Sequence, residues 1–378
     1  MYTIGLNAHL LTAQAGYRSA GINGYIYNLL QALPQVDPSF QYIVFTGRHA
    51  QPPAESRLTV RPTPWGTEQP LRRILWEQVI QPFAAWRLHP DLLHALAFVS
   101  PVLSRIPSVV TVYDLSFVHY PDRLPAARRH YLQWLTKRSC LRARRVIAIS
   151  HSTAHDLVET FRIPANKIDI APPGVGPQFR PAMSFDTDAF RHRHNLPERF
   201  LLFLGTLEPR KNLPVLLRAY ARLPLQDRTQ VHLVLAGGKG WMYDEVFRTI
   251  EEQGIADTVH LPGYVDANDL PLWYNAADAL VYPSIFEGFG LPVVEAMACG
   301  TPVLVSNVSS LPEAAGDTGY RLPPDDVEAW TSALAHVIHD AAWREEAGHR
   351  AMQHAAQFSW HATAAQTVAS YQKALMLL

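Results

Sequence analysis

The stretch from Tyr282 to Val305, YPSIFEGFGLPVVEAMACGTPVLV, limits the possible folds more than any other part of the chain. The apolar run at 279–282 predicts a buried strand, 284–290 a glycine-containing loop, and 291–299 a short helix with a proline in its first turn. A second strand is predicted at 302–306. This order is a βαβ unit, and its first loop lies at the carboxyl end of a parallel strand, where open α/β sheets bind ligands.

Two carboxylates flank the predicted turn. Glu287 lies in the loop and Glu295 in the first turns of the helix, with seven residues between them. Both can face a ligand at the helix N-terminus, where unpaired N–H groups and the positive end of the helix dipole favour a phosphate. The alternative is that Glu295 only complements the charge of the helix start.

The frame E-G-F-G-L-P-x-x-E-A-M-A-x-G-x-P-V resembles the signature of the retaining GT-B glycosyltransferases of family 4. The resemblance covers nearly the whole chain and implies an α/β fold, two doubly wound Rossmann-like domains facing a cleft. It implies that Glu287 hydrogen-bonds the hydroxyls of the transferred sugar and Glu295 those of the ribose. It also places the donor against the intervening loop: Gly288, Phe289, Gly290 and Leu291.

The length and composition agree with two globular domains, because 378 residues with 48% hydrophobic content exceed the ~100–200 residues of one domain. The Pro- and Gly-rich segment APPGVGPQFRP, 171–181, predicts an interdomain linker. We therefore expect an acceptor-side domain at 1–172, a linker at 173–181 and a donor-binding domain at 182–358. The resemblance implies that a C-terminal helix, 359–378, crosses back onto the first domain.

The second half of the chain carries candidate ligands for a diphosphate. Arg210 and Lys211 stand between a predicted strand and a helix, where Lys supplies a point charge and Arg a bidentate fork. Many family members have a further Arg at the position of Thr206, so phosphate binding is expected mainly from Lys211. The resemblance also implies backbone contacts from Tyr264 and Val265 to the nucleotide base.

The first half carries weaker signals. The turn Gly21-Ile22-Asn23-Gly24 opens a helix and could let backbone N–H groups approach an anion. It resembles a family loop beside the donor diphosphate, although Asn23 replaces the usual second glycine. Tyr113-Asp114 ends a strand where relatives commonly have His-Asp, so only Asp114 is carried over as catalytic, with Glu287 and Lys211. Tyr113 and His119 are candidate sugar or acceptor contacts, and a structural role for His119 is the alternative.

Three other segments give local expectations. Residues 47–69 are expected to form a polar loop. Trp76, Ile80, Phe83 and Trp86 recur at helical spacing, which is more typical of core than of a ligand platform. Asp186-Thr187-Asp188 matches a metal-binding Asp-x-Asp, but it lies away from a strand end and is interpreted as a helix cap.

The charge is divided unevenly between the two halves. Residues 1–175 contain 18 Lys and Arg against 10 Asp and Glu, whereas residues 176–378 contain 15 against 23. Much of the excess lies in the predicted helix at 123–145, which also carries apolar residues. Either this face rests on an anionic membrane leaflet, or its apolar residues are core and its arginines are solvated.

Two isolated cysteines, the absence of an 18-residue apolar run and the lack of a basic leader predict a cytoplasmic protein. The resemblance implies transfer of a hexose from a nucleoside diphosphate sugar to a saccharide or lipid-linked acceptor, with no metal, no cofactor and no nucleic acid. GDP-mannose is the first donor expected, since TLEPRKN is similar to mannosyltransferase branches. Alternatives are a UDP- or dTDP-sugar donor, a GT-B epimerase, or a non-catalytic sugar-nucleotide-binding protein.

Overall fold

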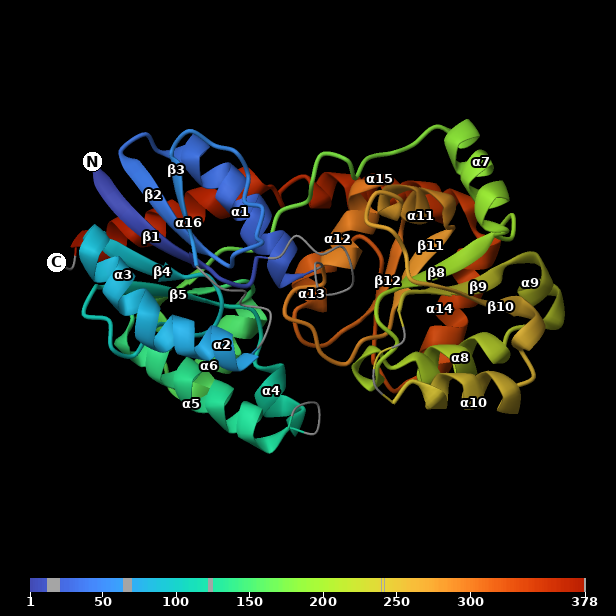
Figure 1. Cartoon of the computed structure of the whole chain (residues 1–378). Coiled ribbons are helices and arrows are strands. Elements are labelled where there is room, and N and C mark those ends of the chain that lie inside the picture. The colour runs from blue at the N-terminus through green and yellow to red at the C-terminus, as the bar shows by residue number, and fades with distance from the viewer. Residues whose placement is uncertain (12–20, 64–69, 122–124, 239, 241, 377–378) are drawn as a thin grey trace. The chain divides into compact units, whose positions relative to one another are not determined.

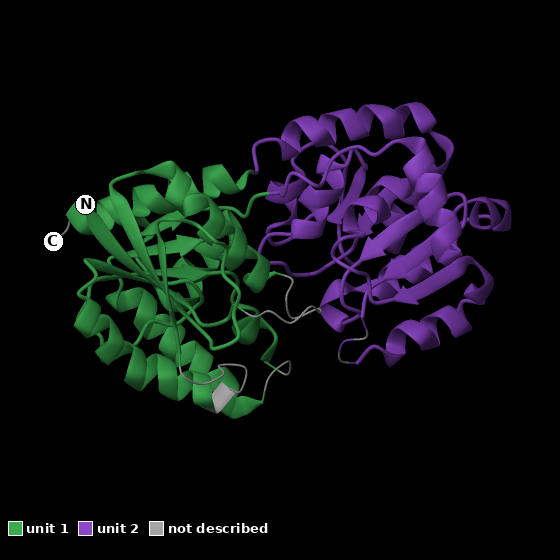
Figure 2. Ribbon diagram, turned by 45° about the horizontal axis from the view of Figure 1, so that its top comes forward, with its two compact units in different colours: residues 1–174, 359–378 green, residues 175–358 purple. Residues whose placement is uncertain are grey.

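The computed structural model describes residues 1–11, 21–63, 70–121, 125–238, 240 and 242–376. The chain forms two compact units, residues 1–174 with 359–378 and residues 175–358 (Figure 2). The chain thus passes from one unit to the other at 174–175 and returns at 358–359. The described residues include no helix long and apolar enough to cross a membrane.

Unit 1 is built on a seven-stranded parallel sheet in the order β3-β2-β1-β4-β5-β6-β7 (Figure 1). The strand order reverses between β1 and β4, which is the topological switch point of a doubly wound sheet. Its strands are β1 (Tyr2–Ala8), β2 (Phe40–Thr46), β3 (Leu58–Pro62), β4 (Leu92–Ala95), β5 (Ser108–Val112), β6 (Arg145–Ala148) and β7 (Ile168–Ile170).

Most helices of unit 1 lie in the connections between these parallel strands, and the last helix follows unit 2 in the chain. They are α1 (Ile22–Val36), α2 (Pro70–Leu75), α3 (Gln81–Leu88), α4 (Ser116–His119), α5 (Ala126–Arg142), α6 (His151–Phe161) and α16 (Trp360–Met376). A single π-helical turn, Trp76–Ile80, joins α2 to α3. The C-terminal α16 packs on α1 and against β4 to β7.

Unit 2 has a six-stranded parallel sheet in the order β10-β9-β8-β11-β12-β13, and its switch point lies between β8 and β11 (Figure 1). Its strands are β8 (Phe200–Leu204), β9 (His232–Ala236), β10 (Val259–Gly263), β11 (Ala279–Tyr282), β12 (Val303–Ser306) and β13 (Tyr320–Leu322). The middle strands are continuous apolar runs because both faces of the sheet are covered.

The helices of unit 2 lie before, between and after these strands. They are α7 (Ser184–His194), α8 (Leu213–Ala221), α9 (Leu225–Gln230), α10 (Asp244–Glu252), α11 (Leu270–Ala276), α12 (Leu291–Ala298), α13 (Leu311–Ala315), α14 (Val327–His339) and α15 (Ala341–Ala355). The two doubly wound parallel sheets confirm the predicted α/β fold class.

Three local expectations were wrong. Residues 47–69 contain β3, an edge strand that ends in a proline and pairs with β2. Phe83 and Trp86 are exposed, at 63% and 66%, so only part of the apolar helical pattern is core. Asp186 lies inside the first turn of α7, whose N-cap position is Met183. The local sequence did not show that the 47–69 segment pairs with β2, that part of the apolar helical stripe faces solvent, or that α7 begins at Ser184.

Candidate active site

The candidate site of unit 2 lies at the switch point of its sheet. Lys211 follows β8, Glu287 follows β11, and these two strands are neighbours in the sheet. Because the carboxyl ends of parallel strands meet at one edge, residues 76 positions apart along the chain come into direct contact.

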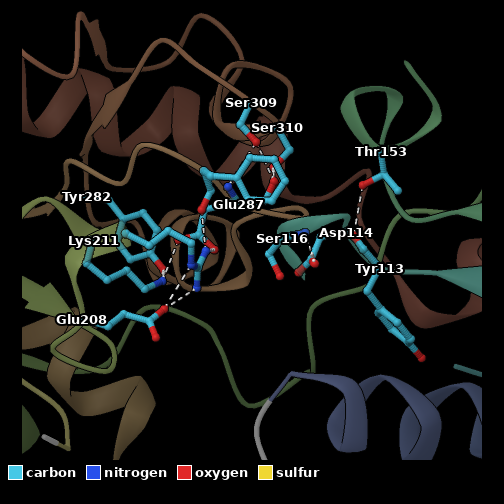
Figure 3. A network of polar contacts seen from close by, with 12 residues as sticks. Tyr113, Asp114, Ser116, Thr153, Glu208, Lys211, Tyr282, Glu287, Ser309 and Ser310 are labelled. Carbon is cyan, nitrogen blue, oxygen red and sulfur yellow. Dashed lines mark hydrogen bonds and ion pairs between the residues drawn. The ribbon is translucent and has the colours of Figure 1, made fainter. Parts of the chain in front are cut away.

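Glu287 binds both predicted cations (Figure 3). Its Oε1 lies 2.6 Å from Lys211 Nζ and its Oε2 lies 2.7 Å from Arg210 Nη1. Lys211 Nζ also donates to the hydroxyl of Tyr282 at 2.6 Å, and Arg210 pairs with Glu208 at 2.8 Å. The result is a network of two cations and two carboxylates, in which Glu208, Lys211 and Glu287 are buried and the Arg210 side chain is 12% exposed.

The backbone around these side chains is fixed by short-range bonds. A 3-10 turn, Pro209–Lys211, ends at Asn212, whose left-handed conformation starts α8. The Arg210 guanidinium donates to the carbonyl of Phe286, and the Arg210 carbonyl accepts from the N–H of Ile285. The loop after β8 is therefore joined directly to the loop after β11.

The main chain of Glu287 is held by two serines that follow β12 (Figure 3). The Ser309 hydroxyl accepts from the Glu287 N–H at 3.1 Å and donates to its carbonyl at 2.6 Å. The Ser310 hydroxyl donates to the same carbonyl at 2.9 Å. These bonds fix the main chain of Glu287 and leave its side chain free to form the ion pairs.

Electrostatics keep Glu287 ionised. Burial alone would raise the pKa of Glu287, but the attraction of Arg210 and Lys211 lowers that pKa to about 2. Burial acts to lower the pKa of Arg210, yet Glu287 and Glu208 outweigh it and raise that pKa. Burial lowers the pKa of Lys211, and its contact with Glu287 opposes this change.

Glu295 lies in a different environment on α12. It is half-buried and accepts a hydrogen bond from the Tyr274 hydroxyl at 2.8 Å. Burial raises the pKa of Glu295 to about 7, although the Tyr274 bond opposes this rise. No ion pair involves Glu295 among the described residues. Two carboxylates of one signature thus differ widely in acidity.

The loop between the two glutamates leads into the start of α12. Gly290 has φ 104°, and a Cβ there would lie 2.9 Å from Leu311 Cδ2. Phe289 is buried and packs edge to face on Phe358, whereas Gly288 and Leu291 are half-buried. The glycine therefore permits a turn that another residue could adopt only with strain.

The remaining donor candidates of unit 2 lie near the ends of other strands. Thr206 lies two residues after Leu204, the last residue of β8. Tyr264 and Val265 follow β10, with Tyr264 exposed and Val265 packed against the core. The structure does not bring these three into the ion-paired network, and their contacts with a donor stay predictions.

The candidates of unit 1 form separate groups. Gly21 is the N-cap of α1, Asn23 is buried in its first turn, and the Gly24 carbonyl accepts from Asn28. The Asp114 carboxylate accepts from the Ser116 N–H at 2.8 Å and thereby starts α4 (Figure 3).

Tyr113 and His119 both have protein partners. The Tyr113 hydroxyl donates to the carbonyl of Leu96 at 2.7 Å, and its own carbonyl accepts from Thr153 (Figure 3). His119 Nε2 lies 3.2 Å from an oxygen of Asp156. These contacts give both side chains structural roles, and their contact with a sugar or acceptor stays a prediction.

Several members of the site were not identified from the sequence. Tyr274, Tyr282, Glu208, Ser309 and Ser310 all contact predicted site residues. Four of them stand in or beside segments that the sequence singles out, but only the coordinates show which side chains turn toward the glutamates. The described residues hold no cluster of three His, Cys, Asp or Glu side chains able to bind a metal.

Comparison with known proteins identifies the family. A model described as "Glycosyl transferases group 1" matches residues 184–354, and one described as "Glycosyltransferase Family 4" matches residues 19–179. The O-antigen chain mannosyltransferase B of Escherichia coli is 35% identical over 266 residues, which is 70% of this chain and 70% of that protein. The chain belongs to the group 1 glycosyltransferases.

Two further similarities agree with this assignment. The serotype-specific mannosyltransferase WbdA of Escherichia coli is 28% identical over 317 residues, and the match covers 79% of this chain but only 38% of WbdA. The solved sucrose-phosphate synthase of Thermosynechococcus elongatus has 24% identity, a TM-score of 0.76 and full coverage of both chains. That structural likeness supports the GT-B fold of this glycosyltransferase.

Proposed function

We propose that this glycosyltransferase transfers mannose from GDP-mannose, with retention of anomeric configuration, to a saccharide or lipid-linked saccharide in polysaccharide synthesis. The observation that carries the proposal is the buried pairing of Arg210 and Lys211 with Glu287 at the switch point of unit 2. The two mannosyltransferases to which the chain is similar support the choice of sugar.

In this proposal the donor diphosphate replaces Glu287 as the anionic partner of Arg210 and Lys211. A donor diphosphate would take Arg210 and Lys211 as its partners, since a phosphate accepts charge-assisted hydrogen bonds from both. The N-terminus of α12 adds N–H groups that favour the same charge. Glu287 would then turn its oxygens to the sugar hydroxyls.

The leaving diphosphate is the group that most needs stabilisation. As the bond between the anomeric carbon and the phosphate oxygen breaks, the electron pair stays with the diphosphate, and fixed cations stabilise the charge that develops there. Glu287, with a pKa of about 2, is a weak base, so hydrogen bonding to the sugar fits it better than proton abstraction. In this proposal no metal ion is needed at the diphosphate.

A donor panel tests the proposed reaction. GDP-mannose, UDP-glucose and dTDP-glucose are each incubated with saccharide acceptors in the presence of EDTA, and products are analysed by mass spectrometry and NMR. We expect a new α-mannosidic linkage from GDP-mannose. Loss of activity in EDTA with recovery in Mn²⁺ or Mg²⁺ would reject metal independence, whereas product from another donor would reject the choice of sugar. An altered donor without acceptor would indicate an epimerase.

We also infer a cytoplasmic location with peripheral contact to an anionic membrane leaflet. Helix α5 carries Arg128, Arg129, Lys137 and Arg138, while Trp134 on the same helix is 60% exposed. Each basic residue near an anionic leaflet contributes roughly 1 kcal/mol to its attraction. Such contact would bring the enzyme to lipid-linked acceptors.

A further inference from the structure

A hollow of about 200 Å³ lies in unit 1, between α5 and the loop that joins β4 to β5. Its lining includes four arginines and several buried serines. The residues that matter here are Arg105, Arg138, Arg142, Arg144, Ser104 and Ser139. The volume is below the ~300–1,000 Å³ of ordinary small-molecule sites, so it suits a small anionic group better than a nucleotide sugar.

The described residues that line this hollow include no Asp and no Glu. The sequence has no Asp or Glu at 92–113 or at 123–155, the segments that supply the entire lining. Arg105, Arg138 and Arg142 form no ion pair with a carboxylate within the described residues. Arg105, Arg138 and Arg142 are exposed, so solvent screens part of their mutual repulsion, and an anion bound between them would lower the remainder.

The arginines are held by protein contacts that leave donors available. Arg142 donates to the carbonyl of Val102 and, at 3.1 Å, to that of Ser104. The Ser139 hydroxyl accepts from the Ser100 N–H at 3.0 Å, so a second hydrogen bond joins α5 to this loop. Arg138 lies over the ring of Trp134 at 5.6 Å. Since a guanidinium has five N–H donors, Arg138 and Arg142 keep further N–H groups that could bind an anion.

The hollow lies at the amino edge of the sheet. Ser108, which begins β5, and Arg144, which precedes β6, both line it. Asp114 follows the carboxyl end of β5, six residues from Ser108 and roughly 20 Å away along an extended strand. The hollow is therefore separate from the edge of unit 1 that carries Asp114.

Large apolar side chains stand beside the arginines. Leu103 and Leu141 adjoin the lining residues Ser104 and Arg142 in sequence, and both leucines are exposed, as is Trp134. A phosphate ester with an apolar chain could place its phosphate against the arginines of the hollow and its chain against the neighbouring leucines and Trp134. A free phosphate would use the charge alone.

We propose that this four-arginine pocket binds a phosphate monoester or diester group. Arginine suits this role because its planar fork matches phosphate oxygens bidentately. The pocket is distinct from the proposed donor site, and the inference does not rest on the identity of the donor. If the phosphate belongs to a lipid, the pocket specifies where the proposed membrane contact is made.

Two binding assays on the full-length protein identify the source of the phosphate. One arm titrates inorganic phosphate and follows binding by calorimetry. The other arm measures co-sedimentation with vesicles of phosphatidylcholine alone and of equal parts phosphatidylcholine and phosphatidylglycerol. We expect binding in at least one arm, and vesicle binding only when phosphatidylglycerol is present.

A matched pair of double variants separates the pocket from general charge. Arg105→Gln/Arg138→Gln removes two pocket cations, and Arg48→Gln/Arg61→Gln removes two exposed cations of unit 1 that neither line the pocket nor lie on α5. The pocket variant should weaken binding by roughly tenfold or more, because hydrogen bonds to charged groups are lost, whereas the control should change it far less. Thermal unfolding verifies that both variants fold.

Each result decides the proposal. If the pocket variant loses binding of inorganic phosphate and the control variant keeps it, the pocket binds free phosphate. If the pocket variant loses only its binding to vesicles that contain phosphatidylglycerol, the pocket binds a lipid headgroup. Binding in neither arm, or equal losses in both variants, would overturn it. Affinity for GDP, measured on the same proteins, reports separately on the proposed donor site.

Discussion

Glu287 and Glu295 belong to one signature, yet their surroundings give them opposite acidities. Two cations lower the pKa of Glu287 to about 2, whereas burial beside Tyr274 raises the pKa of Glu295 to about 7. Glu287 is therefore ionised throughout the physiological range. Glu295 has a pKa of about 7, so of these two glutamates only Glu295 should change its interactions between pH 6 and pH 8.

The acidity of Glu295 gives a pH prediction for nucleotide binding. If ribose hydroxyls donate to its carboxylate, the ionised form binds, and GDP affinity should fall about fivefold from pH 7 to pH 6 as the ionised fraction falls. The affinity should level off above pH 7 because the carboxylate is then fully ionised. Calorimetric titrations between pH 6 and 8 measure this dependence. In Glu295→Gln the affinity should be weaker and flat with pH, and a variant that keeps the wild-type slope would refute the assignment.

Loss of the Glu287 charge should affect both stability and turnover. In Glu287→Gln the buried Arg210 and Lys211 lose a shared counter-charge, a change that costs about 3–5 kcal/mol when a buried pair is broken. We expect a lower melting temperature, which GDP should largely restore because its diphosphate supplies negative charge. Turnover should fall more than donor affinity, since the sugar loses a partner. A variant with wild-type melting temperature and turnover would contradict this account.

At the scale of the elements, α12 depends on the turn that precedes it. The sequence predicted this βαβ unit closely, and the observed helix ends one residue earlier than expected. Gly290 makes the turn possible through its positive φ and its closeness to Leu311. Any distortion there moves the N-terminus of α12 and, with it, the Glu287 loop.

Gly290→Ala tests this coupling against a matched glycine. Gly254 also has a positive φ, 61°, but an added Cβ would meet nothing within 4 Å. Both alanine variants should lose roughly 1–3 kcal/mol from the free energy of unfolding because of backbone strain. Only Gly290→Ala should also weaken GDP binding. Urea denaturation and calorimetry measure the two effects, and equal GDP affinities in both variants would show that the turn does not position the site.

Sequence patterns predicted the positions of strands and helices better than they predicted which side chains contact one another. The strands beside the signature are continuous apolar runs, so their positions were evident, but β3 is a half-exposed edge strand without such a pattern. The candidates Arg210, Lys211 and Glu287 lie together in the structure, and their mutual ion pairs depend on two loops that follow neighbouring strands. Tyr282 and Ser309 complete the network through side-chain directions that no local pattern encodes.

At the scale of the whole molecule, the basic excess of residues 1–175 is concentrated around one structural feature. Helix α5 and the loop before β5 combine arginines with exposed apolar side chains. Charge counts and helical periodicity could not show that this loop lies beside α5. The predicted return of the C-terminal helix is visible in α16, which belongs to unit 1 by its packing on α1. The donor base could not be read, because the expected base contacts come from the backbone of Tyr264 and Val265.

Comparing GDP with guanosine probes the diphosphate site without requiring knowledge of the acceptor. Affinities of both ligands are measured by calorimetry for the wild-type protein and for Lys211→Met, which keeps much of the side-chain volume but removes the charge. We predict that Lys211→Met weakens GDP binding by roughly tenfold to a hundredfold and leaves guanosine binding nearly unchanged, because only the diphosphate contacts Lys211. Equal GDP affinities in the two proteins would contradict the proposal that the cations paired with Glu287 receive the donor diphosphate.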